Sequence, residues 1–205
     1  LVEPGDRVDV TDGTYTLTIS SVPTLTAYLD SAADTVSGTG PEGSTLAVRP
    51  WQFRLAPDYL SWSSGLCYTD TVSGGSYSVG LGSQFDAKAR DFATVYHTTS
   101  EGHKVSAQSY ALTVDAEKGG NRVEGYTPAP GTEVLVELWR GGSSQAVFTT
   151  TSSSSGSYSG SFYDGTPVII TQGETVKVKP QGISTYSLSI PELTVEKDAA
   201  QNEVE

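Results

Sequence analysis

The strongest constraint on this chain is a segment that occurs three times along it. The copies begin at Leu25, Leu112 and Leu193 and read LTAYLDSAADTVSG, LTVDAEKGGNRVEG and LTVEKDAAQNEVE. A valine follows each leucine at the same distance: Val36, Val123 and Val204. The starts lie about 80 residues apart, which is the size of one small sandwich domain, so the sequence predicts tandem domains.

The similarity extends well beyond this segment. Gly75-Ser-Tyr-Ser matches Gly156-Ser-Tyr-Ser, and PGDRVDVTDGTYTLTISSVPTLT near the N-terminus resembles QGETVKVKPQGISTYSLSIPELT near the C-terminus. We therefore expect the chain to open with the last two strands of one repeat, to run through two full repeats, and to stop inside the next. The predicted segments are 1–30 (a preceding or strand-exchanged repeat), 31–116, 117–196 and 197–205.

Alternation of apolar and polar residues predicts short, half-buried strands within each repeat. TEVLVELW places Val134, Val136 and Leu138 on one face, and glycines and prolines separate such runs. The pattern indicates an all-β chain of tandem immunoglobulin-like β-sandwich domains, with about seven strands each and an extra N-terminal β-hairpin. The first repeat carries an insertion, PWQFRLAPDYLSWSSGLCY, which predicts a longer hairpin, and a short helical turn is expected near 87–92.

Composition excludes several classes of function. The net charge is −12, and such a surface repels nucleic acid and anionic lipid, so neither partner is expected. No apolar run is long enough to span a membrane. The single cysteine, Cys67, excludes an intrachain disulfide; we expect it to be a small buried hydrophobe, with an intermolecular bridge as the alternative.

The elements VSGTGPEGSTLAV and NRVEGYTPAPGTEVLV, followed by GSYSV or GSYSG and a closing LTV, resemble bacterial and archaeal Ig-like tandem repeats of large secreted surface proteins. The resemblance covers most of residues 25–205. Such repeats occur in adhesins, S-layers and fibres, and as accessory modules of secreted enzymes. The resemblance implies an extracellular structural or adhesive protein at the cell surface. The chain also begins at Leu1 and contains no methionine, from which we expect a processed N-terminus or a longer parent protein.

An enzyme has little support in the sequence. The two histidines, His97 and His103, neighbour no nucleophile motif, and small repeats of this kind lack a deep cleft for a pair of catalytic carboxylates. No catalytic residue is predicted. The alternative to a structural role is a carbohydrate-binding accessory module of a secreted enzyme.

Oxygen-bearing side chains recur at matching positions after each leucine landmark. Hard cations such as Ca²⁺ bind several such oxygens, so calcium at the linkers between repeats is one interpretation, and a solvated polar linker is the other. No further cofactor is expected. The candidate ligands are Asp30, Asp34, Asp115, Glu117, Asn121, Glu196, Asp198 and Asn202.

The insertion is rich in aromatic residues: Trp51, Phe53, Tyr59 and Trp62. These side chains are interpreted as buried core, as a subunit contact, or as a platform for a surface glycan. Because the predicted end strands lack partners, self-association by β-strand addition is a further expectation.

Overall fold

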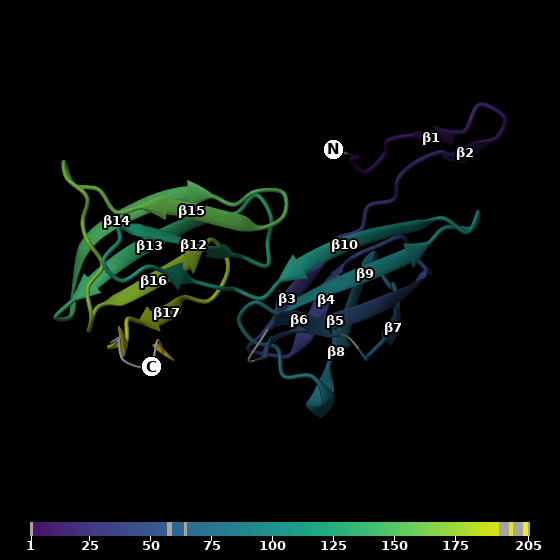
Figure 1. Cartoon of the computed structure of the whole chain (residues 1–205). Coiled ribbons are helices and arrows are strands. Elements are labelled where there is room, and N and C mark those ends of the chain that lie inside the picture. Colours follow the sequence, from purple (N-terminus) through teal and green to yellow (C-terminus); the bar gives the residue numbers. More distant parts are fainter. Residues whose placement is uncertain (1, 57–58, 64, 193–196, 199–202, 205) are drawn as a thin grey trace. The chain divides into compact units, whose positions relative to one another are not determined.

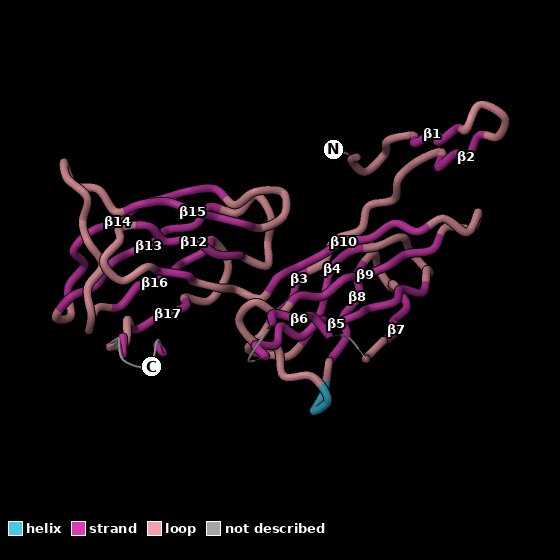
Figure 2. Tube along the Cα trace, in the orientation of Figure 1, coloured by secondary structure: helices cyan, strands magenta, loops and turns pink. Residues whose placement is uncertain are grey.

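The computed structural model of the chain describes residues 2–56, 59–63, 65–192, 197–198 and 203–204, with the backbone alone for 54–63 and from 197 onward. It confirms the predicted all-β architecture of antiparallel sheets (Figures 1 and 2). Within these residues the one helical turn is a 3-10 turn at Gly82–Gln84, so the expected helical turn near 87–92 is wrong. None of the described segments is a helix long and apolar enough to cross a membrane.

The first sandwich consists of two facing sheets. One sheet has the order β3-β4-β8, and the other has the order β10-β9-β5-β6, with β7 also paired to β5. The strands are β3 (Tyr28–Asp30), β4 (Thr35–Thr39), β5 (Thr45–Ala56), β6 (Tyr59–Ser63), β7 (Tyr68–Thr71), β8 (Ser76–Gly80), β9 (Phe92–Thr98) and β10 (Lys104–Tyr110).

The core of this sandwich follows the predicted alternation. Leu46 and Val48 of β5 and Val95 of β9 are fully buried, and they pack with Leu29 and Val36 of the opposite sheet. Burial of a side chain of this size contributes about 1.5–3 kcal/mol. Val36, the valine of the first landmark, therefore belongs to the core, and its leucine, Leu25, is partly buried against it.

The second set of strands repeats this topology. Its sheets have the orders β11-β12-β15 and β14-β13-β16-β17, with Val123, Val134, Val136, Val176 and Val178 fully buried. The strands are β11 (Asp115–Ala116), β12 (Arg122–Tyr126), β13 (Glu133–Arg140), β14 (Ser143–Thr151), β15 (Ser157–Ser161), β16 (Thr175–Pro180) and β17 (Tyr186–Ser189).

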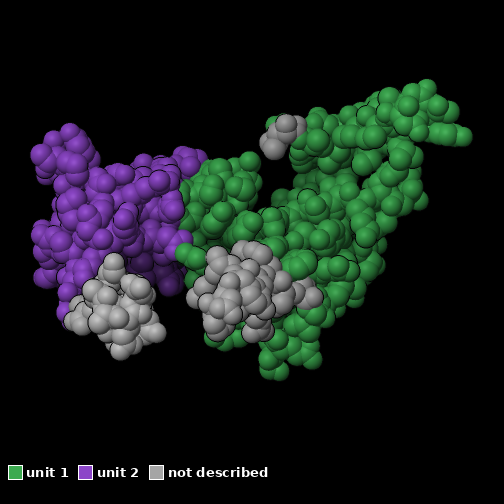
Figure 3. Space-filling view, viewed as in Figure 1, with its two compact units in different colours: residues 1–113, 125–132, 152–158 green, residues 114–124, 133–151, 159–205 purple. Residues whose placement is uncertain are grey.

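The chain divides into two compact units, coloured in Figure 3. One unit contains residues 1–113, 125–132 and 152–158, and the other contains residues 114–124, 133–151 and 159–205. The bounds of these units differ from the four segments predicted from the repeat. The four segments stay a prediction.

Short hairpins lie near both termini. β1 (Val8–Thr11) pairs with β2 (Thr16–Ile19), and β18 (Lys197–Asp198) pairs with β19 (Glu203–Val204). The predicted extra N-terminal hairpin is therefore present. Each pair forms its own two-stranded sheet among the described strands.

The insertion extends one hairpin, as the sequence predicted. The long strand β5 pairs with β7 through residues 45–48 and with β6 through residues 52–56. Cys67, by contrast, is exposed, which corrects the expectation that it is buried. It lies in the segment between β6 and β7, where the chain leaves the extended hairpin.

The outer face of the β13–β16 pair carries a charged cluster. The Glu137 carboxylate lies 2.6 Å from Lys179 Nζ and accepts the Trp139 indole N–H, while Lys177 Nζ lies 3.5 Å from the centre of the Trp139 ring. The hydrogen bond from Lys179 is the main reason why the pKa of Glu137 lies below its ordinary value.

We predict that this cluster makes stability depend on acid. A carboxyl group whose folded pKa is lowered stabilises the fold above its unfolded pKa, and this contribution is lost as the pH falls through the folded pKa. The free energy of unfolding, measured with urea above and below pH 4.5, should be about 0.2–1 kcal/mol lower on the acid side. Glu137→Gln should abolish this difference. Glu133→Gln, at the exposed start of the same strand, is the control. If both variants reduce the pH dependence of stability equally, the contribution is not specific to Glu137.

Candidate functional site

At the start of each sandwich, a tyrosine hydroxyl donates a hydrogen bond to the main-chain carbonyl just before the first strand. Tyr77 of β8 donates to the carbonyl of Thr26 at 2.7 Å, and Tyr158 of β15 donates to the carbonyl of Thr113 at 2.6 Å. Both tyrosines are buried, and burial raises the pKa of Tyr77, so its hydroxyl stays protonated as a donor. The GSYS motif of the sequence thus has a defined physical role.

A glycine lets the two strands come close enough for this bond. A Cβ at Gly125 would overlap the carbonyl oxygen of Thr113 and would lie 2.8 Å from the Tyr158 hydroxyl oxygen, and Gly38 has the same relation to Thr26 and Tyr77. The glycine of the V-x-G pattern is therefore a close-approach position.

Ser109 connects three segments that are distant in sequence. Its hydroxyl accepts the amide N–H of Leu29 at 2.9 Å and donates to the carbonyl of Pro128 at 3.0 Å. The side chain is buried, where a hydrogen-bonded hydroxyl is worth more than in water. All three residues belong to the unit that contains 1–113 and 125–132, so Ser109 fixes the segment after β12 against the first sandwich.

A row of aromatic rings runs through the same unit. Trp51 stacks on Phe92 at 5.7 Å between ring centres, Phe92 contacts Tyr110 at 5.3 Å, and Tyr110 stacks on Tyr126 at 4.4 Å. Burial, followed by the neighbouring Tyr126, raises the pKa of Tyr110. Pairs of this kind add about 0.5–1.5 kcal/mol beyond burial.

Of the predicted aromatic site, Trp51 and Phe53 are half-buried. Trp51 uses one ring face against Phe92, and the Phe53 amide donates to the Asp91 carboxylate. The side chains of Tyr59 and Trp62 lie outside the described part of the structure. The glycan and subunit-contact interpretations of these four residues stay predictions.

The predicted cation ligands do not form one cluster among the described residues. Asp30 and Asp34 lie in the β3–β4 turn, where Asp30 accepts the amides of Ala32 and Ala33, and Asp34 accepts the amide of Ala87. Their carboxylates therefore shape the turn. Asn121 donates to the carbonyl of Phe162.

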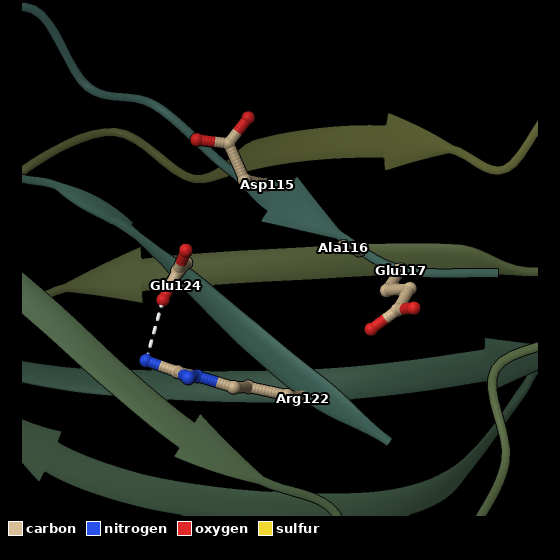
Figure 4. Close-up of a pocket in the computed structure, with 5 residues that line it drawn as sticks. All are labelled: Asp115, Ala116, Glu117, Arg122 and Glu124. Carbon is tan, nitrogen blue, oxygen red and sulfur yellow. Dashed lines mark ion pairs between the residues drawn. The ribbon is translucent and has the colours of Figure 1, made fainter. Parts of the chain in front are cut away.

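Asp115 and Glu117 line a hollow of about 330 Å³ with Ala116, Arg122 and Glu124. Figure 4 shows the carboxylates of Asp115 on β11, of Glu117 just after β11 and of Glu124 on β12. Glu124 pairs with the Arg122 guanidinium at 2.6 Å. Across the described residues, no three acid, histidine or cysteine side chains are arranged to hold a metal ion. Glu196 and Asn202, and the side chain of Asp198, lie outside that part, so calcium at the linkers stays a prediction.

Sequence reasoning missed two buried acids. Asp91 precedes β9 and accepts the amides of Phe53 and Lys88, at 2.7 Å and 2.9 Å. Glu174 precedes β16, accepts the amide of Thr171, and pairs with Arg140 of β13. The signal in the sequence was an acid directly before an alternating strand in both repeats.

Comparisons with known proteins add little to this description. No protein family profile and no curated protein matches the chain. Among 18 matching solved chains is one described as "tetra-tandem repeat in extending region of large adhesion protein", with 22% identity and a TM-score of 0.29. The match covers 85% of this chain and 49% of the other, so this chain spans about half the length of that solved chain.

We predict that Tyr158→Phe lowers the free energy of unfolding by about 1–3 kcal/mol, because the buried carbonyl of Thr113 loses its donor. Tyr163→Phe, at a tyrosine that is 66% exposed, should change it by less than about 0.5 kcal/mol. Chemical denaturation measures both, and equal values for the two variants contradict the role of the Tyr158 hydroxyl.

The glycine predicts a second result. Gly125→Ala should destabilise the fold by about 1–3 kcal/mol, because its methyl group overlaps the Thr113 carbonyl. Gly80→Ala is the matched control, since a Cβ there meets open space within the described structure. Thermal unfolding compares the two variants. An unchanged midpoint for Gly125→Ala would contradict the prediction, because the added methyl group would then be accommodated without loss of stability.

Proposed function

We propose that this chain is a non-catalytic structural or adhesive part of an extracellular surface protein, in which serial immunoglobulin-like sandwiches form a stalk, fibre or lattice. The observation that supports this role most is the matching pair of hydrogen bonds from the Tyr77 and Tyr158 hydroxyls. An identical hydrogen bond at the entry of each sandwich means that one folding unit has been reused along the chain, which is typical of repeat proteins.

The chemistry of the unit that contains Ser109 fits a load-bearing role. Residues 125–132 are held to β10 by the buried Ser109 hydroxyl, which bonds Pro128, and by the stacking of Tyr110 on Tyr126. Contacts of this kind resist bending and separation. The net charge of −12 keeps such a protein soluble and disfavours its association with other acidic surfaces.

Pulling on the two ends of the chain with an optical trap tests the role. We expect two cooperative unfolding events, each releasing about 280 Å for a repeat of about 80 residues. Ser109→Ala should lower the force of one event, while Ser106→Ala, at an exposed serine of the same strand, should leave it unchanged. Gradual extension at low force, without discrete events, contradicts a load-bearing role.

A further inference from the structure

The N-terminal hairpin exposes an apolar face. Val8 and Val10 of β1 lie opposite Ile19 and Leu17 of β2, so all four side chains project from one side of the pair. Val10 is 62% exposed and Leu17 is 60% exposed. A two-stranded hairpin by itself is marginally stable in water, so we expect another element to cover this apolar face.

The start of this hairpin repeats the backbone geometry that begins the last hairpin of each sandwich. A residue in the left-handed region precedes an acid in all three places: Gly5 before Asp6, Arg90 before Asp91 and Gly173 before Glu174. The acid's carboxylate accepts the amide three residues earlier, from Glu3, Lys88 and Thr171 respectively. The acid's carbonyl accepts an amide from the returning chain, from Val22, Ala111 and Ile190 respectively.

Two of the three copies are completed by a neighbouring strand. The second carboxylate oxygen of Asp91 accepts the Phe53 amide of β5, and Glu174 pairs with Arg140 of β13. β5 pairs with β9, and β13 pairs with β16. The carboxylate thus ties the last hairpin of a sandwich to the strand beside it.

The first copy has matching residues, but among the described strands β1 pairs with β2 alone. Val2, Val8 and Val10 stand at the same distances from Asp6 as Ile170, Val176 and Val178 do from Glu174. The latter three are fully buried, whereas Val2 is 61% exposed. Asp6 is also exposed, and within the described residues its carboxylate accepts one hydrogen bond, from the Glu3 amide.

We propose that the β1–β2 hairpin is a docking surface for an immunoglobulin-like sandwich of the same repeat type that lacks its own last hairpin. The occupant lays a strand of the β5 or β13 kind beside β1, with alternating valine and leucine side chains over Val8 and Val10. That strand also presents an amide or guanidinium donor to the free oxygen of Asp6. This inference rests on the proposed serial array, because it adds one sandwich to it.

The test supplies such an occupant to the complete chain. Residues 112–169 are joined directly before Val2, so that Val2 takes the place of Ile170 and β1–β2 the place of β16–β17. The amides of β1 that point away from β2 should then exchange with solvent about 100-fold more slowly than in the unextended chain. Val10→Asp should abolish this protection, while Thr16→Asp, on the opposite face of the hairpin, should preserve it.

A second extension isolates the role of the hairpin. Residues 112–192 joined before Leu1 bring their own β16–β17, so the added sandwich is complete and the β1 amides should exchange as in the unextended chain.

The proposal is overturned if this control folds while the shorter extension leaves β1 unprotected. It is also overturned if the unextended chain forms a dimer that Val10→Asp dissociates, since a second copy would then cover the face. Pulling on the unextended chain uses no added strands, so the docking surface and the load-bearing role can fail separately.

Discussion

The bond from a buried tyrosine hydroxyl to the first carbonyl of a sandwich is the constraint on which the rest of the structure depends. A chain that enters a packed domain carries polar main-chain groups into an apolar region, where an unpaired carbonyl costs about 1–3 kcal/mol. Tyr158 satisfies the Thr113 carbonyl from the opposite side of the strand, and Gly125 provides the space. Three residues from three separate strands or segments must therefore be correct together.

The same requirement applies where the chain leaves β10, because Ala111, Thr113 and Val114 are buried. Ser109 pairs the buried amide of Leu29 and the carbonyl of Pro128, and the neighbouring Tyr110 ring stacks on Tyr126. A hydroxyl clamp and a ring stack are short-range contacts that require defined distances. They restrict motion within this unit more than charged side chains in solvent would, because exposed ion pairs contribute little.

The sequence predicted the features that depend on local pattern, and it missed those that depend on distant partners. The alternation in TEVLVELW identified Val134 and Val136 as core, and the GSYS match identified Tyr158 as equivalent to Tyr77. The contact of Ser109 with Pro128 has no local pattern. Cys67 was expected to be buried because free cysteine usually behaves as a small hydrophobe, but it is exposed in the segment that follows the extended β5–β6 hairpin.

The buried acids show why this fold tolerates charge in its interior. A shift of one residue in strand pairing would turn every core side chain of β9 or β16 toward solvent. Asp91 binds both its own turn and β5, and Glu174 binds both its own turn and β13, so each carboxylate is satisfied in one register alone. A buried ion pair is weak evidence for stability and better evidence for specificity. Asp6 carries the same turn bond without the second strand, which is the arrangement expected of a hairpin whose register is set by the sandwich that receives it.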